Sequence, residues 1–173
     1  MSSEQKENTY SNDLIEKLLE SRRNTSNNDD EHCLEYAGDI NGVTYLNDSK
    51  STRVTRTKHS LESIDAPVIL IIGGNDQEND YYILSQMVRD KVKAIIYLGT
   101  DNDKILRHFI EEYMLFIKVD SIKEAVQYSN HYSVKGEVVL FSPACANDKE
   151  FDNYKTRGRA FKKFVNDLNP KEN

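Results

Sequence analysis

The chain has 173 residues, a length that suits one domain of ordinary size built around a single core. It carries 29 acidic residues against 23 basic ones, for a formal net charge of −6. This balance provides no basic field for the capture of phosphate backbones, so we expect no nucleic-acid partner.

Residues 1–31 are polar and are predicted to form a flexible tail, because the stretch 24–30 holds no apolar side chain for a core. Within this tail, apolar residues recur at helical spacing and predict a short amphipathic helix over residues 11–22. A helix this short is marginal alone in water, so we expect its stripe to cover a surface of its own domain or of a protein partner. The stripe consists of Leu14, Ile15, Leu18 and Leu19, preceded by Tyr10.

Residues 32–173 are predicted to form one domain in which strands and helices alternate. Predicted strands at 36–40 and 43–47 flank Asn41-Gly42, which favours a hairpin turn because both central positions of such a turn need positive φ. Nearly continuous apolar runs follow, and they suit strands that are buried on both faces. These runs lie at 67–72, 92–98, 115–119 and 137–141.

Helices are predicted between and after these strands. Asp101 or Asn102 would cap the third of them, and Asp120 or Ser121 the fourth. The alternation predicts an α/β fold, a Rossmann-like, doubly wound and mainly parallel sheet with helices on both faces. The predicted helices lie at 52–64, 81–91, 102–114, 121–133 and 151–168.

Two short strings lie where a predicted strand ends and a helix begins, the place at which open α/β sheets bind their ligands. They are Asn47-Asp48-Ser49-Lys50-Ser51-Thr52 and Ser142-Pro143-Ala144-Cys145-Ala146. At a helix N-terminus, free N–H groups and the helix dipole favour an anion. A helix cap beside a solvated lysine is the alternative interpretation of the first string.

Gly73-Gly74 follows the most apolar strand, where glycine lets the backbone turn sharply and approach a ligand closely. The pair lacks the spacing of GxGxxG, and the sequence holds no GxxxxGKS/T phosphate loop. Nucleotide binding therefore does not follow from these glycines, and a tight turn between strand and helix is the alternative.

The two strings resemble the N-D-S-K-A-T-N and S-P-A-C-A-S motifs in the C-terminal, third domain of the Mur ligase family, in its MurD branch. The resemblance extends over residues 32–168 and includes four further segments. The family's sugar-nucleotide and ATPase domains would not fit before residue 32, so the resemblance implies the third domain alone. The further segments are His32-Cys33-Leu34-Glu35, Asp39 to Val43, Gly73-Gly74-Asn75-Asp76, and Arg157-Gly158 with Ala160-Phe161.

The resemblance implies ligand-binding roles for one set of residues. Asp48 would face ATP, whereas Lys50 and Thr52 would face the phosphates and D-glutamate, and His32 and Glu35 match the hinge that precedes the domain. The implied ligand-binding residues are Asp48, Ser49, Lys50, Thr52, Gly73, Gly74, Gln77, Asn147 and Tyr154.

Several ligand-facing positions depart from the family pattern. Cys33 replaces an arginine that contacts the nucleotide, and Arg53 replaces the closing asparagine of the first motif. Gln77 replaces a lysine that contacts the carboxylate of D-glutamate, so an ion pair is lost. Asn147 and Asp148 replace residues that cradle D-glutamate, and Asp148 would repel a dicarboxylate.

The remaining histidines and cysteines are interpreted as structural. His32 is expected to be a solvated linker residue, and His59, His108 and His131 to lie on helix surfaces. Cys145 is expected to fill a tight strand end as a small residue, since nothing in the sequence lowers its pKa. The two cysteines lie far apart without a CxxC pair, so we predict reduced thiols and no metal site.

No run approaches the roughly 18 apolar residues that would span a membrane, and the first residues lack the apolar stretch of a signal peptide. We therefore expect a cytoplasmic protein without a membrane partner.

These features predict a domain with no catalytic residue of its own. It would bind a small anionic ligand or a protein partner linked to peptidoglycan precursor synthesis. The alternative is a D-glutamate-adding subunit of a split, ATP-dependent ligase, and ATP with Mg²⁺ would serve as cofactor only beside a partner ATPase domain. A regulatory module that docks on a Mur ligase through residues 11–22 is a third possibility.

Overall fold

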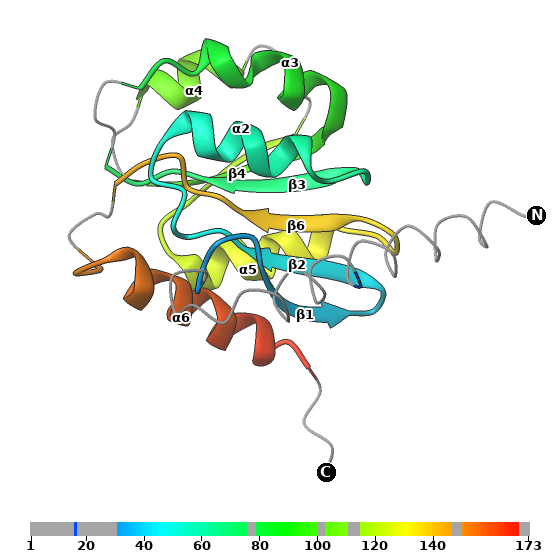
Figure 1. Cartoon of the computed structure of the whole chain (residues 1–173). Coiled ribbons are helices and arrows are strands. Elements are labelled where there is room, and N and C mark those ends of the chain that lie inside the picture. Colours follow the sequence, from blue (N-terminus) through cyan, green and yellow to red (C-terminus); the bar gives the residue numbers. More distant parts are fainter. Residues whose placement is uncertain are drawn as a thin grey trace, which may run out of the picture.

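The structure is a computed structural model that describes residue 16 and residues 31–75, 79–99, 103–110, 115–146 and 150–169. Within these residues, six strands form one sheet between two layers of helices (Figure 1). The strands are β1 (Glu35–Ile40), β2 (Val43–Asn47), β3 (Val68–Ile72), β4 (Val92–Leu98), β5 (Phe116–Val119) and β6 (Val138–Phe141). The helices are α2 (Val54–Glu62), α3 (Tyr82–Lys91), α4 (Asp103–Phe109), α5 (Ile122–Tyr132) and α6 (Tyr154–Asn166).

The strand order across the sheet is β1-β2-β6-β3-β4-β5. β1 pairs with β2 in an antiparallel hairpin whose turn residues Asn41 and Gly42 have φ of 55° and 80°. The other described pairs are parallel, and β3 lies between β6 and β4 near the centre. The predicted α/β fold and the hairpin are therefore confirmed.

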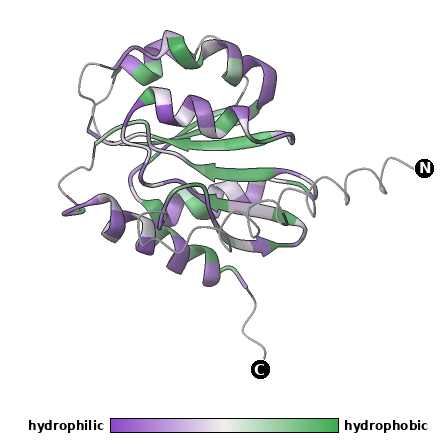
Figure 2. Cartoon of the chain, viewed as in Figure 1, coloured by the Kyte–Doolittle hydropathy of each residue, from purple (hydrophilic) through white to green (hydrophobic). Residues whose placement is uncertain are grey.

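The sheet separates two apolar cores, because successive residues of a strand point to opposite faces. Leu70 and Ile72 of β3 pack with α2, α3 and α4, whereas Ile69 and Ile71 pack with α5 and α6. Figure 1 shows these two groups of helices on opposite sides of the sheet, and Figure 2 shows the central strands as the most apolar elements. A strand that serves both cores needs an unbroken apolar sequence.

The helix boundaries differ from the predicted ones by a few residues. The second helix layer ends in α6, which starts at Tyr154 rather than 151 because Asn153 and Thr156 form a capping box. α2 starts at Val54 because Arg53 keeps an extended backbone. Ser121 caps α5 by accepting a hydrogen bond from the Glu124 N–H, as predicted.

Some predictions lie outside the described residues. The tail helix over residues 11–22 is one of them, apart from Glu16, which is helical and exposed. Asp101 and Asn102 are two more. None of the helices in the described ranges has the length and apolar character needed to cross a membrane.

Candidate functional site

Three loops meet at the carboxyl edge of the sheet, and we refer to them as the site loops. They are residues 48–53 after β2, 73–75 after β3 and 142–146 after β6. Backbone hydrogen bonds join them, since the Gly73 N–H donates to the Pro143 carbonyl over 3.0 Å and the Ala144 N–H to the Ser51 carbonyl over 2.9 Å. The structure thus brings the two motif strings and the glycine pair together.

Gly73 and Gly74 allow the backbones at this edge to approach each other closely. A Cβ atom on Gly73 would lie 1.9 Å from the Leu98 carbonyl oxygen, and one on Gly74 would lie 2.6 Å from that of Ala146. Both residues also have left-handed φ, 133° and 138°. The tight turn is therefore a requirement of the packing, and it accounts for the pair without any ligand.

Asp48 is a buried acceptor that joins the site loops after β2 and β6. Its Oδ2 accepts hydrogen bonds from the hydroxyls of Ser60 (2.6 Å) and Ser142 (2.8 Å), and its Oδ1 accepts one from the Leu34 N–H (3.1 Å). The Ser142 hydroxyl also lies 2.8 Å from that of Thr57. The carboxylate therefore ties the strand ends of β2 and β6 to α2.

Burial raises the pKa of Asp48 above its usual range, and the hydrogen bonds from Ser51, Ser60, Ser142 and the Leu34 N–H only partly offset this effect. Desolvation disfavours the charged form, whereas each donor favours it. The side chain is 1% exposed, so its hydrogen bonds serve the loops themselves. Its implied role toward ATP stays a prediction.

Arg157 of α6 is a second buried group that joins the site loops. Its Nε donates to the Ser49 hydroxyl (3.1 Å), and its Nη2 to the Ser49 carbonyl (2.9 Å). Its Nη1 donates to the carbonyl of Ala146 over 3.2 Å. The planar guanidinium thus connects the loop after β2 with the loop after β6.

The prediction that His32 is a solvated linker residue is wrong, because its side chain is wholly buried. Its ring packs edge-on against Tyr154 and contacts Gly158, so it lies against α6. Its Nδ1 lies 2.7 Å from Asn47 Nδ2 and 3.2 Å from Glu35 Oε2. A local sequence pattern could not reveal this burial, because Gly158, which contacts the ring, lies 126 positions from His32 in the sequence.

The other predicted ligand residues occupy different depths. Ser49 is buried, and its hydroxyl donates to the Tyr154 carbonyl over 2.9 Å. Lys50, Thr52 and Tyr154 are half-buried at the rim of the site loops. The predicted residues that lie outside the described ranges are Gln77, Asn147 and Asp148. Ligand contact stays a prediction for every one of these positions.

The predicted positions of His59, His131 and Cys145 agree with the structure. His59 and His131 are exposed on helices, whereas His108 is half-buried and its Nε2 lies 2.8 Å from the Ser85 hydroxyl. Cys145 is buried with its Sγ 3.2 Å from the Tyr81 hydroxyl, as suits a small packed residue. The described residues contain no cluster of three or more potential metal ligands.

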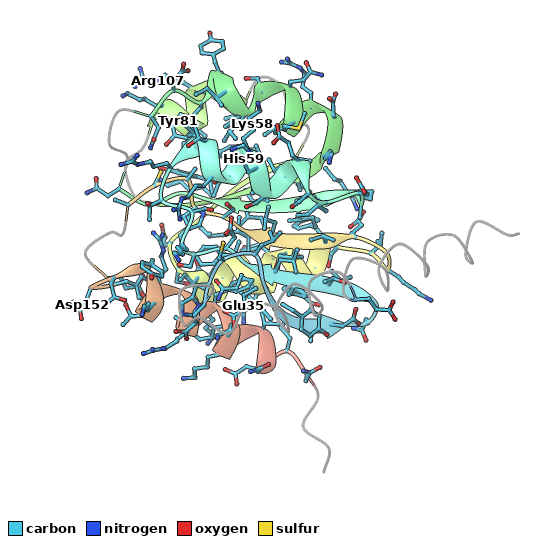
Figure 3. All side chains as sticks on the ribbon, viewed as in Figure 1. Glu35, Lys58, His59, Tyr81, Arg107 and Asp152 are labelled. Carbon is cyan, nitrogen blue, oxygen red and sulfur yellow. The ribbon has the colours of Figure 1, made fainter. Side chains whose placement is uncertain are left out.

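The surroundings of the site extend to both faces of the sheet. Figure 3 shows Glu35 on the side of α6 and Tyr81 on the side of α2 and α3. Glu35 Oε1 accepts from Lys162 of α6 over 2.9 Å, which fixes the start of β1 to that helix. Sequence reasoning missed the roles of Arg157, Ser60 and Thr57; the Arg157-Gly158 pair was a signal for Arg157, and no sequence signal pointed to Ser60 or Thr57.

Comparison with known proteins identifies relatives of this chain. The chain is 46% identical over 138 residues to the UDP-N-acetylmuramoylalanine–D-glutamate ligase of Christiangramia forsetii, covering 80% of this chain and 31% of that enzyme. The enzyme of the same name from Porphyromonas gingivalis is 40% identical over 157 residues, which cover 91% of this chain and 34% of the relative. The chain thus spans about a third of the length of these relatives. No family model matches the sequence.

Solved structures show the same fold. A crystallised domain of a UDP-N-acetylmuramate:L-alanyl-gamma-D-glutamyl-meso-diaminopimelate ligase from Haemophilus ducreyi aligns with a TM-score of 0.54 at 11% identity, covering 79% of this chain and 99% of that domain. The UDP-N-acetylmuramate–alanine ligase MurC of Thermotoga maritima aligns with a TM-score of 0.51 at 11% identity, covering 80% of this chain and 30% of MurC. At this identity the likeness concerns the fold alone.

Proposed function

The chain is a MurD-like C-terminal domain of the Mur ligase family, and on that premise we propose that its site loops bind a small anionic ligand in peptidoglycan precursor synthesis. One observation carries the proposal. Two motif strings about ninety-five positions apart meet at one edge of the sheet, joined by the Asp48–Ser142 hydrogen bond. Buried polar groups that hold loops in this way are typical of a ligand site.

The proposed ligand is anionic because of the charges at the rim. Lys50 is half-buried and Arg53 and Arg56 are exposed, and Arg56 Nη1 lies 3.4 Å from the Lys50 carbonyl. The one acidic side chain of the first string, Asp48, is turned inward and buried. The outer surface of this loop therefore presents cations, which favour phosphate or carboxylate groups.

We propose that the domain does not catalyse ligation by itself. The relatives are named for a reaction that joins D-glutamate to UDP-N-acetylmuramoylalanine, and the matched region is about a third of each of them. Ligation of this kind needs ATP held in a phosphate site, and the printed sequence carries no phosphate loop. The proposal includes a cytoplasmic location.

Calorimetric titration tests the ligand. Purified protein is titrated with ATP, ADP, D-glutamate and UDP-N-acetylmuramoylalanine, alone and in pairs. We expect saturable binding of at least one of them, weakened about tenfold by Lys50→Ala and unchanged by Lys58→Ala, a variant of a lysine on the following helix that pairs with Glu62. Absence of saturable binding for all four compounds would contradict the proposal.

The second candidate function is a ligase subunit that works beside a partner carrying the ATPase domain. The amphipathic pattern of Leu14, Ile15, Leu18 and Leu19 favours it, because such a stripe suits a partner surface. Deletion of residues 1–23 should then abolish co-purification of that partner. If the stripe covers its own domain instead, the deletion should lower the melting temperature, and no change in either measurement would exclude both uses of the stripe.

A further inference from the structure

The segment that precedes β1 contains a wholly buried ring, that of His32. We infer that His32 is a positioning residue, which seats residues 31–34 on α6 beside Arg157 and thereby sets the arrangement of the site loops. The effect on ligand affinity rests on the proposed function, whereas the effect on the loops does not. The seat, as we call it, consists of His32, Asn47 and Gly158.

The first step of the argument is the fit between the ring and α6. A Cβ atom on Gly158 would lie 2.4 Å from His32 Nδ1, so the ring occupies the space that any other residue at position 158 would fill. His32 also adopts a left-handed φ of 65°, which a non-glycine residue rarely keeps without compensating contacts. The buried packing of the ring on α6 supplies that compensation.

The second step is the link from the ring to the first motif string. Asn47 Oδ1 accepts from the Ser49 N–H over 3.2 Å, and Asn47 Nδ2 donates to Glu35 Oε2 over 3.1 Å. In this orientation the same Nδ2 faces His32 Nδ1 at 2.7 Å, so the ring nitrogen accepts. The Asn47 side chain is therefore bonded to both the His32 ring and the Ser49 N–H, so a shift of the ring also shifts Ser49.

The third step concerns the main chain of residues 31–34. The His32 carbonyl accepts from the Lys50 N–H over 3.0 Å, and the Leu34 N–H donates to Asp48 Oδ1 over 3.1 Å. Two residues of the first string are thus held directly by the segment that His32 seats. Loss of the seat would release one donor from Asp48 and one acceptor from Lys50.

The fourth step is the position of the seat on α6. Gly158 follows Arg157, whose guanidinium holds Ser49 and Ala146. Two adjacent residues of a helix move together. If the contact between the His32 ring and Gly158 is altered, Arg157 therefore shifts as well. The Glu31–Arg159 ion pair beside the seat is a weaker anchor, because its charged atoms lie 3.9 Å apart and both side chains are partly exposed.

A size-exchange experiment tests the inference in a Cys33→Ser background, in which Cys145 is the remaining thiol. Cys145 is buried in the loop that Arg157 holds, so its alkylation rate reports local opening of the site loops. We expect His32→Ala and Gly158→Ala each to raise this alkylation rate at least about tenfold. Because the opening is local, the raised rate should not change with urea concentration at low urea. The double variant should return toward the parent rate, because the added methyl group takes part of the space vacated by the ring.

A merely structural role gives a different result. Val165→Ala removes buried packing from the same helix, so it should accelerate alkylation only through global unfolding, which rises with urea. Additive rates in the double variant, or a His32→Ala rate that rises only with urea, would overturn the inference. If Gly158→Ala fails to fold, the urea dependence of Cys145 alkylation in His32→Ala, compared with that in Val165→Ala, still tests whether His32 positions the site loops.

Calorimetry separates this inference from the proposed function. With ADP and D-glutamate as the probes, His32→Ala should weaken any binding that Lys50→Ala weakens. If none of the four compounds titrated above binds the parent protein, the proposed function fails while the Cys145 measurement still tests the seat. Unchanged affinity in His32→Ala beside accelerated alkylation would overturn the coupling to the ligand.

Discussion

The two edges of the sheet differ in how they use polar residues. At the carboxyl edge, Asp48, Arg157 and His32 are buried; Asp48 and Arg157 bond the loops after β2 and β6, and His32 bonds Asn47 at the end of β2. At the amino edge, Asn41-Gly42 forms a turn, and the part-exposed Lys93 pairs with Glu137, whose side chain is buried. Burial of charged groups opposes folding unless they are bonded well, so the cluster of buried polar groups that holds loops at the carboxyl edge favours a function there.

Backbone conformation separates the edges in the same way. Among the described residues, His32, Leu34 and Ala144 have left-handed φ at the carboxyl edge, whereas Asn41 is the non-glycine example at the other. Asparagine tolerates this conformation in a hairpin turn, but leucine and alanine adopt it at a cost. The carboxyl edge therefore holds strain that the surrounding hydrogen bonds offset.

The largest expected effect comes from filling the space between Gly73 and the end of β4. Gly73→Ala should lower the free energy of unfolding by about 4 kcal/mol or prevent folding, because the new Cβ would overlap the Leu98 backbone. Gly42→Ala at the amino edge should cost about 1–2 kcal/mol, since its Cβ would meet the movable Lys135 side chain. Urea unfolding measures both, and equal costs would break the comparison.

Arg157→Ala is expected to follow in size. It removes the Arg157 donors from the hydroxyl and carbonyl of Ser49 and one of two donors from the Ala146 carbonyl, which keeps the Asn75 N–H, at a cost of about 3 kcal/mol. Arg159→Ala, two positions along the same helix and exposed, should change the free energy of unfolding by less than about 0.5 kcal/mol. A small effect of Arg157→Ala would mean that the guanidinium does not hold the loops.

The fold followed from the sequence because its signals are local. A strand that packs against two cores must be apolar throughout, as Val68–Ile72 is. The Asn41-Gly42 pair favours a hairpin turn by its residue types alone. Boundaries were less accurate where side chains decide them, as at the Asn153 capping box that starts α6. The burial of successive strand residues was thus readable, whereas the exact first turn of a helix was not.

The site followed only in part, because its partners come from distant positions. The first string indicated Asp48, but the donors that surround it belong to Leu34, Ser60 and Ser142. Nothing near His32 in the sequence reports the gap that Gly158 provides for its ring. Residue type and spacing identify a loop, whereas the depth of each side chain in it depends on packing across the fold.

The pH dependence of stability sharpens the comparison further. Because burial raises the pKa of Asp48 in the folded state, the folded chain holds this proton to higher pH than the unfolded chain does. The contribution of Asp48 to stability therefore falls as pH rises from the unfolded pKa of about 3.9 through the raised folded pKa. Asp48→Asn has no titrating carboxyl at this position, so its free energy of unfolding should rise relative to that of the parent as pH increases over this range.

Urea unfolding of both proteins at a series of pH values, from about 3 to about 8, checks the sign. Ser60→Ala removes a 2.6 Å donor to the carboxylate, so it should make the fall steeper. A difference between parent and Asp48→Asn that stays constant with pH would show that burial does not disfavour the ionised carboxylate.

The smallest effects concern one lysine at each edge. Lys93 lies 2.8 Å from Glu137 at the amino edge, and Lys162 lies 2.9 Å from Glu35 near the seat. Part-exposed pairs of this kind contribute about 1 kcal/mol or less, so Lys93→Ala should cost about 0.5 kcal/mol and less at high salt. Lys162→Ala should cost more, about 1 kcal/mol, because Lys162 is less exposed than Lys93, and Glu35 accepts from Asn47 and the His32 N–H whereas Glu137 accepts from the Val134 N–H. Equal costs at both edges, measured by urea unfolding at low and high salt, would mean that the seat gains nothing from the neighbouring Lys162–Glu35 ion pair.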